Sequence, residues 1–243
     1  MQRALKLSVS LTLVALAWLA GAAPAAIAQQ IVAQSNFVNR QAVTAIPQIS
    51  ITVRADFVLF SLRYTTATKS EDARTAELTR MYQTVTQRAP RADGITIEVG
   101  QPGNSAALET VSMKEIILKP AQDRSDMNLV VKVAVKPNDT FNAIRARVEK
   151  FVADTPLNGR VEAIIGDNQF LGIADPKKHR DALVKMIAED VKMMQATFGN
   201  GAPPVAVDLS SMESRISTRP VGPLDLEVYI PYRMEVWSGP PPR

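Results

Sequence analysis

The clearest pattern of apolar and polar positions lies near the end of the chain, from Asp175 to Phe198. Asp175 can accept the free amide hydrogens of a helix start, Pro176 suits a first helical turn, and Gly199 ends the segment. The apolar positions recur at helical spacing and form one stripe, which consists of Leu183, Ile187, Val191, Met194 and Phe198. The pattern therefore predicts a helix with one side on a core and its other sides in water.

The segment from Leu224 to Trp237 has a different period, because apolar and polar residues alternate in it one by one. This alternation is typical of a strand with one buried face. Pro231 cannot donate a hydrogen bond to a β-ladder, so the strand either lies at a sheet edge or contains a bulge at this residue. We expect both halves of the strand to lie in one sheet.

The same two periods recur earlier in the chain. Helical spacing predicts one helix that begins at Ser70 and another that is capped by Asn138 or Asp139. Residues 166–168, a Gly-Asp-Asn segment, interrupt a later apolar run, which leaves either a strand pair or one long bent strand with a bulge. Strands are predicted over residues 49–53, 57–64, 95–99, 127–135 and 161–174, and residues 106–126 are predicted to form one or two more.

Together these elements predict an α+β fold in which helices pack on a mixed β-sheet. Two strand-helix-strand units span residues 57–99 and 127–173, and the C-terminal helix with its long alternating strand follows them. We expect one domain over residues 49–237, preceded by an extended arm at residues 29–48. Residues 238–243 contain three prolines and are predicted to be a disordered tail.

The N-terminus carries a segment that is predicted to be removed. Arg3 and Lys6 precede an apolar run from Leu7 to Ala20, and small residues follow up to Ala28. This arrangement is typical of a secretory signal peptide, residues 1–28, with cleavage after Ala28. The alternative is an uncleaved membrane anchor, but the run is shorter than the ~20 apolar residues that span a bilayer.

Composition excludes several kinds of chemistry. The chain has no cysteine, which excludes disulfides, thiolate catalysis and cysteine-ligated metals. Removal of 28 of the 243 residues leaves 215, enough for one substantial domain. Loss of Arg3 and Lys6 takes the formal charge from +4 to +2, which is too mild to indicate nucleic-acid binding or strong membrane attraction.

A family resemblance rests on the order of these elements across residues 49–237. The first part is a strand that leads into a helix, at Leu59–Val85, and the second is a strand and helix at Leu129–Val135 and Phe141–Val152. The closing helix follows, and the last elements lie at Pro203–Leu209, Arg219–Pro223 and Leu226–Val236. In an exported chain this order resembles the SIMPL-domain family, also called DUF541. That family includes periplasmic oxidative-stress defence proteins and an outer-membrane-associated antigen of pathogenic bacteria.

The resemblance implies a periplasmic or envelope location, a tendency to form homo-oligomers and a link to stress protection. With the predicted signal peptide and the absence of a catalytic set of residues, it leads to the hypothesis of a non-enzymatic exported protein of the bacterial envelope that assembles with itself and supports tolerance of oxidative or envelope stress. The alternative is a periplasmic binding module that holds a small ligand or a protein partner in a groove between helix and sheet. The family offers no agreed catalytic residues, so we assign no catalytic, cofactor-binding or metal-binding residue.

Candidate catalytic residues are few in the chain itself. His179 is its one histidine, and the spacing supplies no serine and carboxylate to form a triad with it, so we interpret it as an exposed helix residue. It lies in the basic run 177–180, which is either a solvated helix face or a contact for an anionic lipid or partner. Glu189 and Asp190 are adjacent, so they diverge on a helix instead of converging for acid-base work.

Metal and phosphate motifs are also incomplete. Residues 166–168 resemble part of a calcium loop, but the regular acidic spacing and the terminal glutamate are missing, so a plain turn is the better interpretation. Residues 100–103 contain two glycines without the lysine and the following helix of a phosphate loop, and we expect them to form a turn. Residues 138–140 match a glycosylation acceptor, which we interpret as a helix cap.

The methionines support one further hypothesis. Thioethers are oxidised reversibly, so surface methionines could scavenge oxidants, although core packing is the favoured interpretation. The methionines concerned are Met81, Met113, Met127, Met186, Met193, Met194, Met212 and Met234.

Overall fold

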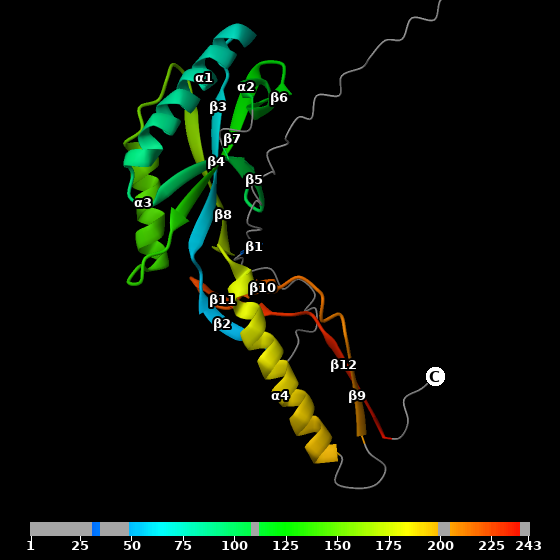
Figure 1. Ribbon diagram of the computed structural model, residues 1–243. Helices are drawn as coiled ribbons and strands as arrows, with labels where there is room; N and C mark the ends of the chain where they lie inside the picture. The colour runs from blue at the N-terminus through cyan, green and yellow to red at the C-terminus, as the bar shows by residue number, and fades with distance from the viewer. Residues whose placement is uncertain (1–30, 35–48, 108–111, 199–204, 239–243) are drawn as a thin grey trace, which may run out of the picture.

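The computed structural model describes residues 31–34, 49–107, 112–198 and 205–238 (Figure 1). The predicted signal peptide lies outside these residues, as does the tail after Ser238. Of the predicted arm at residues 29–48, the structure describes only β1 (Ile31–Gln34), which pairs with the edge of the main sheet.

The main sheet has seven strands, and its core consists of two interleaved units. In one unit α1 (Glu71–Arg88) connects β3 to β4, and in the other α3 (Phe141–Ala153) connects β7 to β8. The strand order β8-β3-β7-β4 places a strand of each unit between the two strands of the other, which is the split β-α-β order of ferredoxin-like folds. The bounds are β3 (Phe57–Thr66), β4 (Ile95–Gln101), β7 (Arg124–Ala134) and β8 (Glu162–Ile173).

This arrangement confirms the predicted α+β class and corrects one detail of it. Every pair of neighbouring strands in the described sheets is antiparallel, whereas a mixed sheet was expected. The reason is the interleaving: the two strands joined by each helix run in the same direction, but a strand of the other unit separates them.

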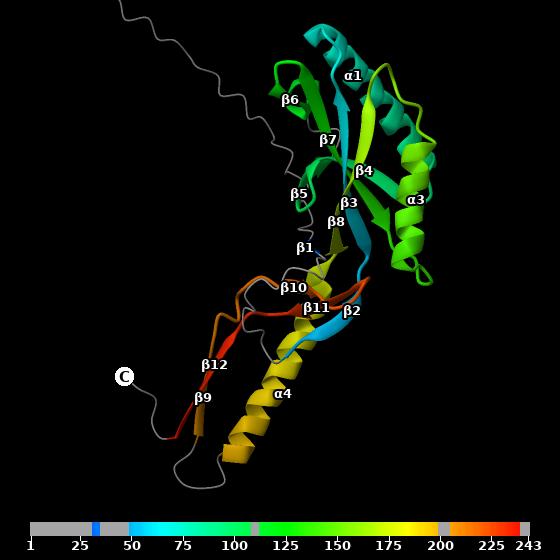
Figure 2. The ribbon, with the colours of Figure 1, turned by 180° about the vertical axis from the view of Figure 1, so that it is seen from behind.

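Both helices of these units cover the same face of the main sheet (Figures 1 and 2). The hydroxyl of Ser70 accepts a hydrogen bond from the Ala73 N–H, so α1 begins as predicted. The cap of α3 is Thr140, and neither Asn138 nor Asp139 fills that position. Asp139 instead accepts hydrogen bonds from the Lys136 N–H and from Arg147, which explains the shift of the helix start.

The predicted strand over residues 106–126 is wrong in its middle. This stretch contains the end of β5 (Asn104–Ala107), a short helix α2 (Met113–Ile116) and β6 (Ile117–Ala121), and residues 108–111 lie outside the described chain. The carboxylate of Glu115 accepts hydrogen bonds from both the N–H and the hydroxyl of Ser112. That Ser-x-x-Glu contact favours a helical turn over an extended chain.

The bent strand β8 is continuous, which confirms the second of the two alternatives for residues 161–174. Its pairing with β3 shifts between Phe60 and Leu62, where β8 contributes Gly166, Asp167 and Asn168 opposite Ser61 alone. These extra residues form the bulge that the Gly-Asp-Asn segment predicted.

The expectation that Leu224–Trp237 lies in one sheet is wrong. This segment divides into β11 (Asp225–Tyr229) and β12 (Arg233–Ser238), which belong to different sheets. At the break, the Tyr232 N–H donates to the Ile230 carbonyl at 2.9 Å, which closes a tight turn around Pro231. Strand β11 lies between β10 (Ser217–Pro220) and β2 (Ile51–Arg54), while β12 pairs only with β9 (Val205–Ser210) within the described chain.

The C-terminal helix forms where the sequence predicts it, with a tighter first turn. Asp175 caps a 3-10 turn, η3 (Pro176–His179), which continues into α4 (Arg180–Phe198). Leu183 and Ile187 of the predicted stripe are buried in the same core cluster as Leu226 and Val228 of β11. The stripe does not stay buried after Asp190, because its later positions are half-buried or exposed.

The second half of α4 and the β9-β12 ribbon extend away from the main sheet (Figures 1 and 2). We define this part as the projection: residues 191–198 of α4 together with β9 and β12. None of its side chains that the structure describes is buried. The projection therefore has secondary structure without a core of its own.

Candidate functional site

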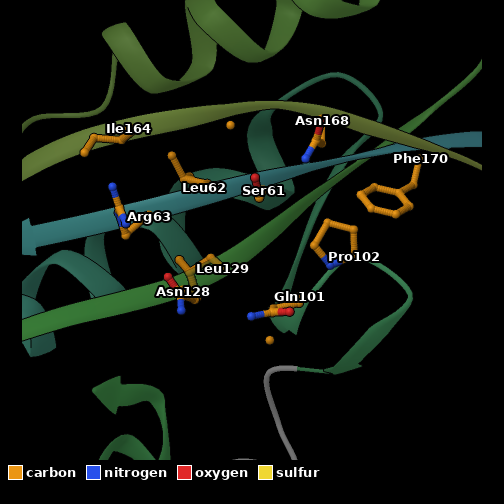
Figure 3. Close-up of a pocket in the computed structure, with 12 residues that line it drawn as sticks. Ser61, Leu62, Arg63, Gln101, Pro102, Asn128, Leu129, Ile164, Asn168 and Phe170 are labelled. Carbon is orange, nitrogen blue, oxygen red and sulfur yellow. The ribbon is translucent and has the colours of Figure 1, made fainter. Parts of the chain in front are cut away.

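A groove of about 450 Å³ lies on the face of the main sheet that α1 and α3 leave uncovered (Figure 3). Side chains of β3 alternate between the two faces: Phe60 and Leu62 enter the large core, whereas Leu59 belongs to a small second cluster on the open face. The lining of the groove comes from β3, β7, β8 and the β4-β5 turn. It consists of Ser61, Leu62, Arg63, Gly100, Gln101, Pro102, Asn128, Leu129, Ile164, Gly166, Asn168 and Phe170.

The shape of the groove depends on the bulge in β8. A Cβ atom at Gly166 would lie 2.0 Å from the Ser61 hydroxyl oxygen, so a side chain at this position would clash with β3. Glycine therefore allows β8 to pass close to Ser61 while the bulge carries Asn168 to the groove (Figure 3).

The lining supplies hydrogen-bonding groups and one cation. Ser61, Gln101, Asn128 and Asn168 supply neutral donors and acceptors. Among the lining residues, all in the described chain, no carboxylate, imidazole or thiol accompanies Ser61. Within the same part of the chain no hydrogen bond or ion pair holds the guanidinium of Arg63, so this exposed cation is available to a ligand.

The turn at residues 100–103 forms as predicted and joins β4 to β5 with Pro102 and Gly103 at its centre. Gly103 has a φ of +87°, the left-handed conformation that the third position of a type II turn requires. The turn therefore shapes one end of the groove.

His179 lies far from this groove, at the end of η3, and is half-buried instead of exposed. Burial lowers the pKa of its imidazole, and the charge of Lys178 lowers it further. The expectation of a fully exposed residue is wrong because the 3-10 turn brings this side chain partly under its neighbours.

The basic run at residues 177–180 is partly used by the fold. Lys178 approaches the Asp56 carboxylate at 3.7 Å. Arg180 donates to the carbonyl of Ser214 at 3.1 Å and also to that of Met212, which ties the chain after β9 to the start of α4. Lys177 is exposed, as a solvated face would have it, whereas Lys178 and Arg180 bind other parts of the chain, which neither alternative anticipated.

The acidic candidates do not converge. Glu189 is exposed whereas Asp190 is buried, so the two carboxylates point apart as expected. Asp167 and Asn168 belong to the β8 bulge, where a turn or bulge was predicted. Across the described residues, no cluster of three or more His, Cys, Asp or Glu side chains could hold a metal ion.

The methionines fall into two groups. Met81 and Met127 are fully buried, which confirms core packing for these two. Met186 and Met193 are exposed on α4, so they remain candidates for oxidation. Met113, Met194, Met212 and Met234 are half-buried.

A buried polar cluster under α1 was not predicted. Arg74 and Glu77 face the core from the same side of the helix as Leu78 and Met81. Burial opposes ionisation of Glu77, but hydrogen bonds from Thr66, Thr68 and the Arg160 backbone outweigh it and hold the pKa of this carboxyl below its usual range. The sequence spacing could have revealed this cluster, because Arg74 and Glu77 continue the apolar stripe of α1 toward the start of the helix.

No protein-family model matches this chain, and no curated protein sequence is detectably similar to it. Within the described residues, every helix is too short or too polar to cross a membrane.

Proposed function

We propose that this chain is a non-enzymatic exported protein of the bacterial envelope, related to the SIMPL-domain proteins, that assembles with itself through the projection. Cleavage after Ala28 would deliver it to the periplasm, where the assembly would support tolerance of oxidative or envelope stress. The observation that carries the proposal is the projection, in which none of the described side chains is buried.

The apolar exposure of the projection supports this role. Phe198 is 60% exposed, Met193 is 56% exposed and Val236 is 41% exposed. A two-stranded ribbon is marginally stable in water unless a third strand or a helix covers it. Association with a second copy would supply that cover and remove these side chains from water.

The charges of β12 favour a second copy as the partner. Glu235 pairs across the ribbon with Asp208, so two carboxylates lie beside one arginine, Arg233, at 2.6 Å from Glu235. If β12 pairs antiparallel with β12 of a second copy about Met234, each Arg233 lies opposite the other copy's Glu235. The pairing would place an opposite charge across from each Arg233 and each Glu235 and would cover an open sheet edge.

Sizing of the secreted form tests the proposal. The chain from residue 29 to residue 243 should elute as a dimer or larger assembly, and Phe198→Ser should shift it toward the monomer by exposing less apolar surface for burial. Leu157→Ser is the matched control, because Leu157 is similarly exposed but lies outside the projection. Monomeric elution of the unchanged protein at every concentration would count against assembly.

Mild peroxide treatment followed by peptide mapping tests the stress role and the interface together. Met186 lies outside the projection and should be oxidised in every sample, while buried Met81 and Met127 should be protected. Met193 should be oxidised faster in the Phe198→Ser variant than in the assembled protein. Protection of all these methionines in both samples would eliminate scavenging.

The second candidate function is a binding module, and the groove of Figure 3 favours it through its unpaired Arg63 and its neutral hydrogen-bonding lining. A polar ligand bound to the native state should raise the melting temperature. Arg63→Ala should abolish that shift, and Arg124→Ala, outside the groove, should preserve it. Screening of small polar anions and amides by thermal shift provides the measurement.

A further inference from the structure

A second hollow lies on the helix-covered side of the main sheet, away from the groove of Figure 3. It has a volume of about 440 Å³ and forms where α1 ends, where the short helix η1 (Ala89–Arg91) leads to β4, and where α3 passes beside them. This volume suits a small organic molecule. Neither the sequence motifs nor the proposed assembly accounts for the residues that line it.

Cations outnumber carboxylates in this hollow. Its lining includes Arg88, Arg91, Arg147 and Lys150 against Asp93 and Asp154. Both carboxylates already have lysine partners: Asp154 accepts from Lys150 at 2.8 Å, and Asp93 pairs with Lys136 from outside the hollow. Arg147 is paired with Asp139 outside the hollow, and Asp154 also lies in the field of Arg88. The lining itself still carries four cations against two carboxylates.

Two of these guanidinium groups also lack hydrogen bonds that they could make. The Nε atom of Arg88 and the Nη1 atom of Arg147 are buried, and neither has a hydrogen-bond partner among the described residues. Arg147 uses its other terminal nitrogen to donate to Asp139. A buried N–H group without an acceptor is destabilising by about 1–3 kcal/mol. The terminal nitrogens of Arg88 also have no hydrogen bond among the described residues, so a small rotation of this guanidinium toward a ligand oxygen would break no existing bond.

The walls beside the arginines are apolar. Ile95 and Phe151 are buried members of the core that reach the hollow, and Ala92 lies next to them. Inorganic phosphate would leave this part of the site empty. A ligand with an apolar body could contact Phe151 while its charged group lies between Arg88 and Arg147.

We propose that this hollow is a binding site for a small organic oxyanion, a phosphate or carboxylate group attached to an apolar body. The oxyanion accepts hydrogen bonds from Arg88 and Arg147, with Arg91 adding charge at the rim. The apolar body packs on Phe151 and Ile95. The site is separate from the projection and does not depend on the assembly proposed above.

Thermal shift and calorimetric titration of the chain from residue 29 to residue 243 test this site. Phenyl phosphate and benzoate, as the two oxyanion forms, should raise the melting temperature, whereas benzyl alcohol should not, because it lacks the charge. Inorganic phosphate should bind more weakly than phenyl phosphate, because it makes no apolar contact. Equal affinity for inorganic phosphate and phenyl phosphate would contradict the claim that the ligand has an apolar body. If neither aromatic anion shifts the melting temperature, the proposed site is wrong.

Arg88→Gln is the informative variant because Arg88 has no described hydrogen bond that its loss would break. It should weaken phenyl phosphate binding by about 10-fold or more, the equivalent of one charge-assisted hydrogen bond. Arg80→Gln, on an exposed position of the same helix, and Arg63→Ala, in the groove on the other face, should leave the affinity unchanged. Equal affinity in Arg88→Gln and the unchanged protein would place the anion elsewhere and overturn the proposal.

Discussion

Replacing Arg74 with alanine is expected to lower the free energy of unfolding by about 3 kcal/mol. Arg74 is 3% exposed, and its guanidinium connects α1 to the chain just before it and to the hairpin of β6 and β7. It donates to Ser125 at 3.1 Å, to the Thr68 carbonyl at 2.8 Å and to the Gln122 carbonyl at 2.8 Å. Removal of the side chain leaves buried Ser125 and half-buried Thr68 without this donor.

Urea unfolding measured by circular dichroism gives the change directly. Arg80→Ala is the matched control, because Arg80 lies on the same helix but is exposed and bonds only to the carbonyl of Ala76 among the described residues. This control should change stability by less than about 0.5 kcal/mol. An equal loss in both variants would mean that helix propensity, and not the buried cluster, explains the effect of Arg74.

The second large effect is expected at the edge strand β12. Glu235→Arg should weaken self-association by about 10-fold, because in the proposed pairing it places two arginines opposite each other at two symmetric positions. Within one copy the same change places a cation opposite Asp208 but removes the ion pair between Arg233 and Glu235. The circular dichroism spectrum of this variant should therefore be compared with that of the unchanged protein, to show that the ribbon is retained.

Reversal of the charges at residues 233 and 235 distinguishes this pairing from other arrangements of the two copies. The double variant Arg233→Glu with Glu235→Arg restores an opposite charge at each position, so it should recover assembly. Sedimentation velocity at low salt provides the measurement, since exposed charge pairs are screened at high salt. A double variant that stays as weak as the single one would contradict the pairing about Met234.

Local patterns predicted much of the secondary structure because the forces that select it act over a few residues. Ser70 caps α1 as expected, and the alternation after Phe57 produces β3. The turn and the bulge that line the groove were also predicted, from the glycines of residues 100–103 and from the Gly-Asp-Asn segment at residues 166–168. A local signal was overlooked once, at Ser112 and Glu115, because neighbouring apolar residues favoured a strand.

The groove and the hollow themselves were not predictable in this way. Ser61, Asn128 and Asn168 lie in three strands that become neighbours only when the two units interleave. Arg88 and Arg147 come from different helices that meet on one face of the sheet. Sequence spacing does not report such contacts, because they depend on which strands pair over long separations.

By itself, the sequence determined the α+β class, the starts of α1 and of the C-terminal helix, the apolar stripes and the absence of thiol chemistry, since each depends on residue type and local spacing. Only the tertiary structure decided that Leu224–Trp237 serves two sheets and that α4 leaves the core after Asp190. An alternating pattern indicates that one face of a strand is buried, but it does not identify the strand that pairs with it. Pairing between distant segments decides this, and here it leaves the projection without a core of its own.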